Sequence, residues 1–218
     1  MPVKAKICGI NRPEALRAAA DGGARYIGLV FFAKSPRNVS LPLAAELARM
    51  VPTGVRTVGL FVDPTDEFLD QTLAQVPLDL IQLHGEETPG RVAAIRAAHR
   101  LPVMKALKIE TAADLDAASA YEPVADILLF DAKPPAKLLN GPPILPGGNG
   151  VAFDWTLLTG RRWSKPWMLS GGLTPDTVAE AIRVSGADAV DVSSGVEDRP
   201  GHKDPALIRA FLDAVRGV

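Results

Sequence analysis

Short apolar runs alternate along the chain with longer stretches in which apolar residues recur every three or four positions among polar ones. The runs are rich in β-branched residues and are typical of strands covered on both faces. The longer stretches are rich in alanine and leucine and have the spacing of helices. The pattern predicts eight strands, over residues 3–8, 26–31, 57–62, 78–83, 103–107, 127–130, 166–169 and 189–192.

Most of the predicted strands are followed by a signal for the start of a helix. A short polar side chain there can accept hydrogen bonds from the first free N–H groups of the helix, and proline fits its first turn. Glycine then ends helices and leads into the next strand, as at Gly22 and Gly186. The predicted starts are Asn11 before Pro13, Ser40, Thr65, Thr88, Thr111, Thr174 before Pro175, and Asp204 before Pro205.

This alternation predicts an α/β fold, a closed (β/α)₈ TIM barrel that residues 1–218 form as a single domain. A doubly wound open sheet of similar length would show the same alternation and remains an alternative. No linker or shift in charge divides the chain. In a barrel the active site lies at the carboxyl ends of the strands and in the loops after them, so candidate residues are sought there.

The overall charge favours a small molecule as the partner. The 218 residues include 24 Lys and Arg and 25 Asp and Glu, so the net charge is close to zero, and there is no basic tail. Neither nucleic acid nor an anionic membrane surface is therefore indicated as a partner. The chain also lacks a long apolar run and an export signal, so we expect a cytoplasmic protein. Its single cysteine gives no internal disulfide and no zinc cluster. The oligomeric state is open between monomer and homodimer.

Two glycine-rich loops follow the last two predicted strands, and these loops are neighbours in a barrel. Glycine lets backbone N–H groups approach an anion closely, and serine adds hydroxyl donors, so the pair predicts a site for a phosphate monoester. Either loop alone would indicate only a turn. No Walker loop or GxGxxG accompanies them, so a nucleotide is not implied. The predicted phosphate ligands are Gly171, Gly172, Ser193, Ser194 and Gly195.

A thiol and a carboxyl group are predicted to face each other across the barrel. Counting by two along the first strand points Cys8 inward, and Asp131 closes the apolar strand at 127–130. Alone, each has a plainer interpretation: an inert buried thiol and a solvated strand end. Together they can move protons as an acid and base pair.

Such a pair needs shifted pKa values. With reference values near 8.5 and 3.9, roughly 3% of a thiol is thiolate and about 0.1% of an aspartate is protonated at pH 7, so the working form would cost about 6 kcal/mol. We therefore expect burial to raise the pKa of Asp131, and the cation of Lys6 to lower the pKa of Cys8.

Several ordered motifs resemble those of the phosphoribosylanthranilate isomerase family of tryptophan biosynthesis, over nearly the whole chain. They are KICGI at 6–10, SPR at 35–37, GLFV at 59–62, QLHG at 82–85, GGNG at 147–150 with FDW at 153–155, LSGGL at 169–173, and DVSSGVE at 191–197. The resemblance implies a (β/α)₈ barrel without metal or organic cofactor. It also implies the Amadori rearrangement of N-(5-phosphoribosyl)anthranilate to carboxyphenylamino-deoxyribulose phosphate.

The resemblance also divides the roles of the site residues. It makes Asp131 the general acid that protonates the furanose ring oxygen, and Cys8 the general base that removes the C2′ proton. It places Arg37 near the anthranilate ring, and Asp191 at the sugar hydroxyls or the anthranilate nitrogen unless that carboxylate is purely structural. Gln82 and His84 share a strand face and are expected to line the bowl. His84 can equally be a wall residue that takes no part.

Two departures from the family pattern lie in one loop, and two other functions stay open. The loop at 132–150 is long and rich in proline, with Asn149 where the family usually has threonine, and we expect it to form a lid or rim. An indole-glycerol-phosphate synthase-like lyase would need a lysine acid and a glutamate at strand ends. Lys34 faintly fits that pattern, but KICGI and the lack of a strand-ending glutamate argue against it. The other alternative is a noncatalytic phosphate-binding barrel, in which Cys8 packs and Asp131 is a cap.

Overall fold

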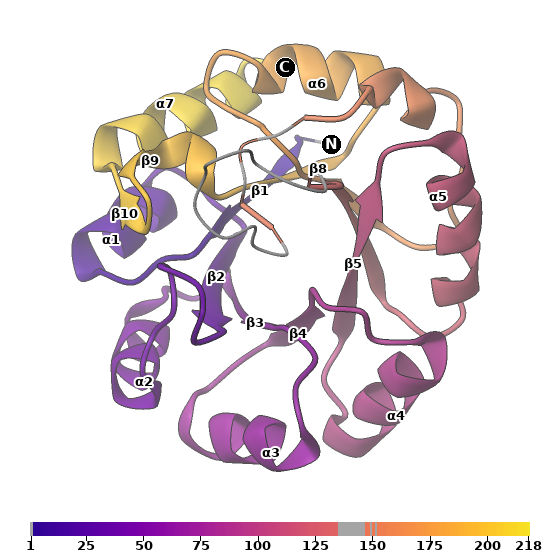
Figure 1. The fold of residues 1–218 in the computed structure, drawn as a ribbon. Helices are drawn as coiled ribbons and strands as arrows, with labels where there is room; N and C mark the ends of the chain where they lie inside the picture. Colours follow the sequence, from indigo (N-terminus) through magenta and orange to yellow (C-terminus); the bar gives the residue numbers. More distant parts are fainter. Residues whose placement is uncertain (1, 135–146, 149, 151) are drawn as a thin grey trace, which may run out of the picture.

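The computed structural model describes residues 2–134, 147, 148, 150 and 152–218. Eight parallel strands close in sequence order into a barrel, seen along its axis in Figure 1. β1 pairs with both β2 and β8, which confirms the barrel and rules out the open sheet. The strands are β1 (Lys4–Cys8), β2 (Tyr26–Phe31), β3 (Arg56–Phe61), β4 (Leu80–Leu83), β5 (Val103–Ile109), β6 (Ile127–Ala132), β7 (Trp167–Leu169) and β8 (Ala189–Val192).

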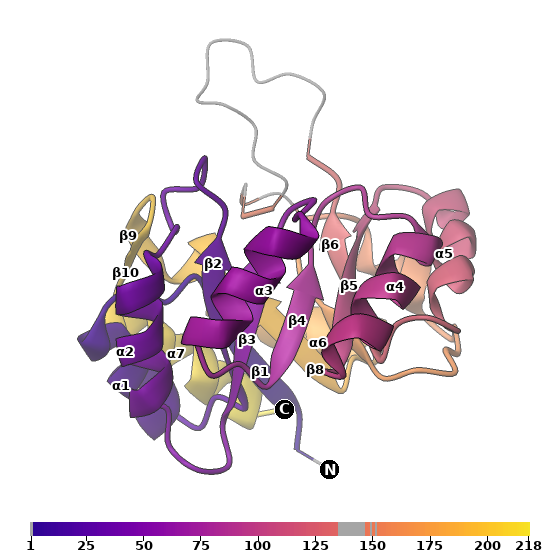
Figure 2. The same ribbon diagram turned by 90° about the horizontal axis from the view of Figure 1, so that it is seen from below.

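Helices form a ring around the barrel, and in Figure 2 the arrowheads of the strands point toward one end of it. The described residues contain α1 (Pro13–Asp21), α2 (Leu41–Met50), α3 (Asp66–Gln75), α4 (Pro89–His99), α5 (Ala112–Ala118), α6 (Val178–Ser185) and α7 (Pro205–Arg216). The described residues also contain three short 3₁₀ helices: η1 (Ser119–Tyr121), η2 (Trp155–Leu158) and η3 (Ser194–Val196). No helix of the described part is long and apolar enough to cross a membrane.

Four of the predicted helix starts are confirmed by capping hydrogen bonds. The side chains of Ser40, Thr65 and Thr88 each accept from the N–H three residues on, and Asp204 accepts from the N–H groups of Ala206 and Leu207. These bonds satisfy N–H groups that the first turn of a helix leaves free. Thr111 also precedes its helix directly.

Two predicted starts are wrong. Arg12, not Asn11, precedes α1, and the Asn11 amide instead donates to the carbonyl of Gly201, 2.9 Å away. At the other position, the backbone carbonyl of Thr174 accepts from the N–H of Val178 and closes a turn. α6 therefore begins later, after Thr177. Both polar side chains are thus engaged in contacts other than the expected cap.

The interior of the barrel is apolar toward one end and polar toward the end where the strands finish. Apolar side chains fill its lower part: Tyr26, Val58, Leu80, Met104, Ala106, Leu129, Met168 and Ala189. Nearer the carboxyl ends of the strands, buried polar side chains replace them, among them Lys6, Gln82 and Asp191. The large apolar cluster lies between the strands and the helices and fixes the barrel from outside.

Two differences from the predicted strands bear on the site. β5 and β6 run on to Ile109 and Ala132, so Asp131 pairs with Lys108 inside a ladder instead of following the strand. A small hairpin, β9 (Glu197–Arg199) with β10 (His202–Lys203), was not predicted. Its strands are too short and too charged to give an alternating pattern.

Candidate active site

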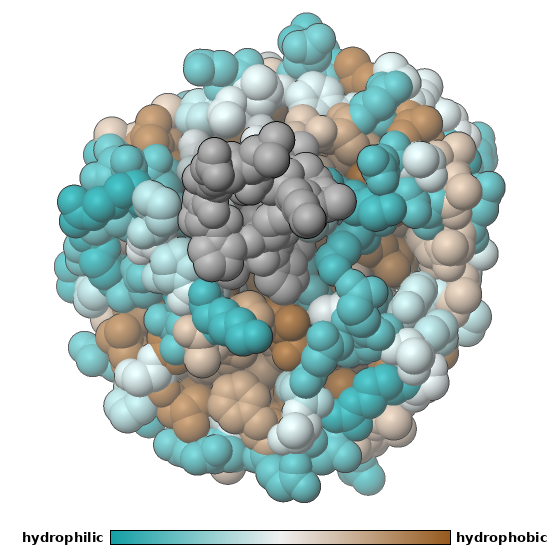
Figure 3. Space-filling model, in the orientation of Figure 1, coloured by the Kyte–Doolittle hydropathy of each residue, from teal (hydrophilic) through white to brown (hydrophobic). Residues whose placement is uncertain are grey.

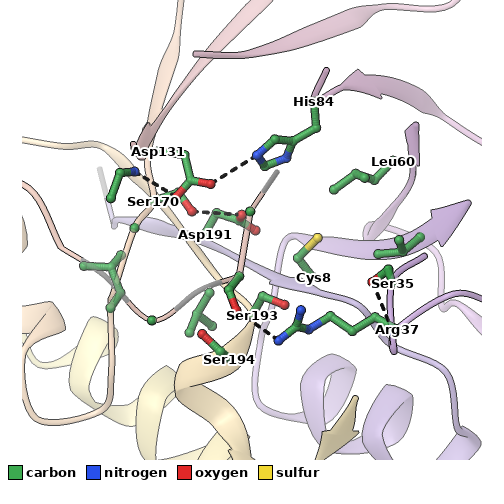
Figure 4. Close-up of a pocket in the computed structure, with 18 of the residues that line it drawn as sticks. Cys8, Ser35, Arg37, Leu60, His84, Asp131, Ser170, Asp191, Ser193 and Ser194 are labelled. Atoms are coloured by element: carbon green, nitrogen blue, oxygen red, sulfur yellow. Dashed lines mark hydrogen bonds and ion pairs between the residues drawn. The ribbon is translucent and has the colours of Figure 1, made fainter. Parts of the chain in front are cut away.

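A cavity opens at the carboxyl ends of the strands. Cys8 from β1 and Asp131 from β6 both line it, and Figure 4 shows their side chains directed into the same space. Both are nearly buried, with 4% and 5% of their surface exposed. In Figure 3, hydrophobic side chains show among polar ones on the face that this end presents. The structure therefore brings the predicted thiol and carboxyl group together.

Asp131 is fixed by two hydrogen bonds. Its Oδ1 accepts from the N–H of Ala132 at 2.9 Å, and its Oδ2 lies 3.1 Å from Nε2 of His84. His84 also lines the cavity, but Gln82 does not. Gln82 lies behind His84 with Nε2 3.2 Å from the His84 Nδ1, because β4 places both side chains on its inner face. The expectation that Gln82 lines the bowl is therefore wrong.

A buried ion pair lies beneath Cys8. Lys6 Nζ donates to Asp191 Oδ1 at 2.9 Å, and Ser170 donates to the other carboxylate oxygen at 3.2 Å. Burial alone would lower the pKa of Lys6, but Asp191 and then Cys8 outweigh it and raise that pKa above its ordinary value. Asp191 also lines the cavity, so it holds the Lys6 cation while one edge still faces the open space.

The expected lowering of the Cys8 pKa is wrong in direction. Burial is the largest effect and raises the pKa of the thiol above its ordinary value, while Lys6 opposes this and Asp191 adds to it. The physical reason is that burial disfavours a thiolate more than Lys6 stabilises it, and the Asp191 carboxylate beside Lys6 repels the same negative charge.

The two glycine-rich loops form the opposite wall. Gly171 and Gly172 have φ of 90° and 64°, a region in which side chains are strained, and Ser193 and Ser194 complete the wall. Within the described residues, no hydrogen bond occupies the N–H groups of Gly171, Gly172 or Ser194. These donors are therefore free for an anion.

Gly195 has a packing role in addition to the predicted one. It does not line the cavity, and a Cβ at this position would lie 1.9 Å from the carbonyl oxygen of Leu173. Glycine is thus required where the loops after β7 and β8 touch. This packing role does not involve the backbone N–H of Gly195, which donates no hydrogen bond among the described residues, so Gly195 stays a predicted phosphate ligand.

Arg37 belongs to a buried network of charges. Its Nε and Nη2 donate to the two carboxylate oxygens of Glu197 at 2.8 and 2.9 Å, and Lys203 donates to the same carboxylate and to Ser193. Arg37 lines the cavity, but most of its charge faces Glu197 instead of the open space. A ligand carboxylate beside Arg37 would therefore share its guanidinium with a protein carboxylate.

The sequence did not predict this network, which contains a lysine with a shifted pKa. Burial lowers the pKa of Lys203 to about 8. Glu197 opposes this shift but does not cancel it, because the Glu197 carboxylate is shared with Arg37. The pKa of Glu197 is lowered despite burial, since Arg37 and Lys203 both stabilise its charge. Ser170 stood in a motif and Glu197 ended one, but nothing local marked Lys203.

The Lys203 shift predicts a stability that rises with pH. Between pH 8 and 10.5 the folded protein has released this proton while the unfolded chain keeps it, so the free energy of unfolding should rise by up to about 3 kcal/mol. Urea unfolding of wild type and Lys203→Met at pH 7.5 to 10 measures the effect as a difference between the two proteins. The raised pKa of Cys8 acts in the opposite direction but is common to both. Equal pH slopes would contradict the shift.

The remaining wall of the cavity is apolar. Val30 in β2 and Leu60 in β3 pack with Cys8, and Phe32 and Val62 come directly after these two strands. Figure 4 shows Leu60 apart from the two serines of the loop after β8. The cavity therefore has an anion-ready end and an apolar end, with the thiol and the carboxyl group between them. Residues 135–146 and Asn149, in the loop expected to form a lid or rim, lie outside the described residues.

The closed barrel and this cavity at its carboxyl end define a (β/α)₈-barrel enzyme. The sequence model of the family described as N-(5'phosphoribosyl)anthranilate (PRA) isomerase matches residues 5–214. The chain therefore belongs to the PRA isomerase family.

Known proteins agree with this assignment. An N-(5'-phosphoribosyl)anthranilate isomerase of Rhodospirillum centenum is 68% identical over 97% of both chains. The solved phosphoribosyl anthranilate isomerase of Thermotoga maritima is 35% identical, with a TM-score of 0.86 over 99% of this chain and 100% of its own. Another solved one, 33% identical with a TM-score of 0.82 over the same shares, is in complex with reduced 1-(o-carboxyphenylamino)-1-deoxyribulose 5-phosphate.

Proposed function

We propose that the chain converts N-(5'-phosphoribosyl)anthranilate to 1-(2-carboxyphenylamino)-1-deoxyribulose 5-phosphate, with Cys8 as general base and Asp131 as general acid. As a member of the PRA isomerase family, it is an isomerase of tryptophan biosynthesis. The observation that carries the assignment of roles is the cavity lined by both side chains, between free N–H donors and an apolar wall.

The two ends of the cavity match the two ends of this substrate. A phosphate dianion suits the free N–H groups of Gly171, Gly172 and Ser194, and the anthranilate ring suits the apolar side chains in and after β2 and β3. Arg37 also lines the cavity, and a ligand carboxylate beside it would compete with Glu197 for its guanidinium. The ribose then lies between Cys8 and Asp131.

The rearrangement moves protons and breaks one carbon–oxygen bond. Asp131 gives its proton to the furanose ring oxygen as the C1′–O bond opens, which leaves a protonated Schiff base at C1′. The Cys8 thiolate removes the proton on C2′, and the electron pair of that C–H bond neutralises the Schiff base as an enolamine. The enolamine becomes the ketone when the C2′ hydroxyl loses a proton and C1′ gains one, so substrate and product are isomers.

Because the pKa of Cys8 is raised, the thiolate needs a nearby positive charge, and the protonated Schiff base supplies it. Burial keeps the thiol protonated in the free protein, and Lys6 is already paired. A cation formed at C1′ lies beside C2′ and favours the thiolate at the moment when a base is needed. The substrate itself thus supplies the charge that the protein lacks.

The test is a direct assay with freshly made N-(5'-phosphoribosyl)anthranilate. We expect protein-dependent loss of its anthranilate-type fluorescence, and mass spectrometry should find a product of unchanged mass. A boiled sample corrects for spontaneous breakdown of the substrate. A product that has lost mass would indicate lyase chemistry, and binding without turnover would indicate a noncatalytic phosphate-binding barrel. Either result would overturn the proposal.

A further inference from the structure

Behind Asp131, three polar side chains form a line that ends inside the barrel. Asp131 Oδ2 lies 3.1 Å from His84 Nε2, and His84 Nδ1 lies 3.2 Å from Gln82 Nε2. Gln82 has no exposed surface and does not line the cavity. Its other amide atom, Oε1, is buried without a hydrogen-bond partner among the described residues. A buried orphan acceptor is costly, so this amide requires an explanation.

The hydrogen bonds of this line fix where the protons are. An amide NH₂ can only donate, so Nδ1 of His84 must accept and its ring proton must be on Nε2. Nε2–H then donates to Asp131 Oδ2, while the N–H of Ala132 donates to Oδ1. Since both oxygens of Asp131 receive hydrogen bonds, this arrangement stabilises the ionised carboxylate.

Turning the Gln82 amide over would reverse the line without moving any other atom far. Oε1 would then accept from a proton on His84 Nδ1, and the NH₂ group would take the place among the described residues where the amide has no partner, so neither orientation is fully satisfied. Nε2 of His84 would be bare and could accept from a protonated Oδ2 of Asp131. That arrangement stabilises the carboxylic acid, the form that a general acid needs at the start of the reaction.

We propose that Gln82 is a positioning residue that selects the ring nitrogen of His84 that carries the proton, and thereby the protonation state of Asp131. The proposal rests on the function proposed above, in which Asp131 is the acid. One amide orientation matches Asp131 before it gives its proton to the ring oxygen, and the other matches the carboxylate left afterwards. Between the two arrangements the ring proton of His84 changes from Nε2 to Nδ1 and Asp131 gains one proton from solvent, which is the proton that it then gives to the ring oxygen.

The tautomer of His84 can be read directly by ¹⁵N NMR of histidine-labelled protein. The chain has only three histidines, so the His84 signals are assigned by their loss in His84→Gln. In the free wild type we expect protonation at Nε2 alone. Gln82→Met removes the donor and the acceptor at similar length, so both tautomers should appear. Gln82→Glu offers only acceptors when its carboxyl group is ionised, so the spectrum is recorded at a pH where it is, and the proton should then be on Nδ1.

Kinetics then separate positioning from mere packing. Gln82→Met should lower kcat on the order of tenfold or more, a part of what a general acid contributes, with KM within about twofold because Gln82 does not reach the cavity. Met104→Leu is the matched control: Met104 is the β5 register partner of Gln82, is fully buried, and touches no proton of the line. It should keep the tautomer and kcat of wild type.

Two results would overturn the proposal. One is a single Nε2–H tautomer in both Gln82 variants, and the other is a lower kcat in Gln82→Met without any change of tautomer. Should Gln82→Met fail to fold, Gln82→Glu alone decides, since a proton still on Nε2 there contradicts the proposal. A failure of the proposed function is distinct from these outcomes, because it would show as absence of turnover in wild type whatever the tautomer.

Discussion

Replacing Cys8 by alanine is expected to lower kcat/KM by about a thousandfold or more, the upper range for loss of a positioned base. Cys8 is the only cysteine, and the described part of the cavity offers no second thiol. Asp191, a carboxylate that also lines the cavity, is engaged with Lys6 and Ser170. The fluorescence assay measures the loss, with the variant protein at high concentration.

The control for this loss is binding of the phosphate end of the ligand. Cys8 belongs to β1, whereas Gly171 and Gly172 follow β7, so inorganic phosphate should inhibit or bind the variant as it does the wild type. Removing a small buried side chain costs on the order of 1 kcal/mol of stability, which urea unfolding checks. Turnover at the wild-type rate in Cys8→Ala would remove the thiol from the mechanism.

The barrel could be predicted because its pattern is local. Each strand is a short apolar run between helix stretches, and caps such as Ser40 and Thr65 lie within a few residues of the helices they start. Cys8 and Asp131 could be paired for the same reason. Once the strands are placed, barrel geometry brings their carboxyl ends around one cavity without further information.

The charge networks could not be predicted, because their partners are remote in the sequence. Lys6 pairs with Asp191 at the other end of the chain, and Arg37 pairs with Glu197 from an unpredicted hairpin. Without these partners Lys6 appeared free to act on Cys8, and the direction of the Cys8 pKa followed wrongly from that. Which cation is already paired depends on tertiary contacts that no local pattern carries.

Asp131→Asn is expected to cut turnover by a factor of about 10² to 10⁴ or more, with binding of product retained, because an amide of the same shape cannot give up a proton. The asparagine oxygen can still accept from the N–H of Ala132, and its NH₂ can donate to His84 Nε2 when the ring proton is on Nδ1, so the side chain stays in place. The single-turnover rate at high enzyme concentration measures the residual activity. A variant with the wild-type rate would exclude Asp131 as the acid.

The residual activities of the two variants decide which partner is acid and which is base. With Asp131 removed, the remaining requirement is a thiolate, whose pKa burial raises, so the residual rate should rise with pH through the neutral range. With Cys8 removed, the remaining requirement is a protonated carboxyl group, so the residual rate should fall as pH rises. If the roles were reversed, Asp131→Asn would need a neutral thiol and Cys8→Ala a carboxylate, and both rates would be flat around pH 7. The two slopes therefore test a division of roles that the symmetry of an acid and base pair across one cavity leaves open.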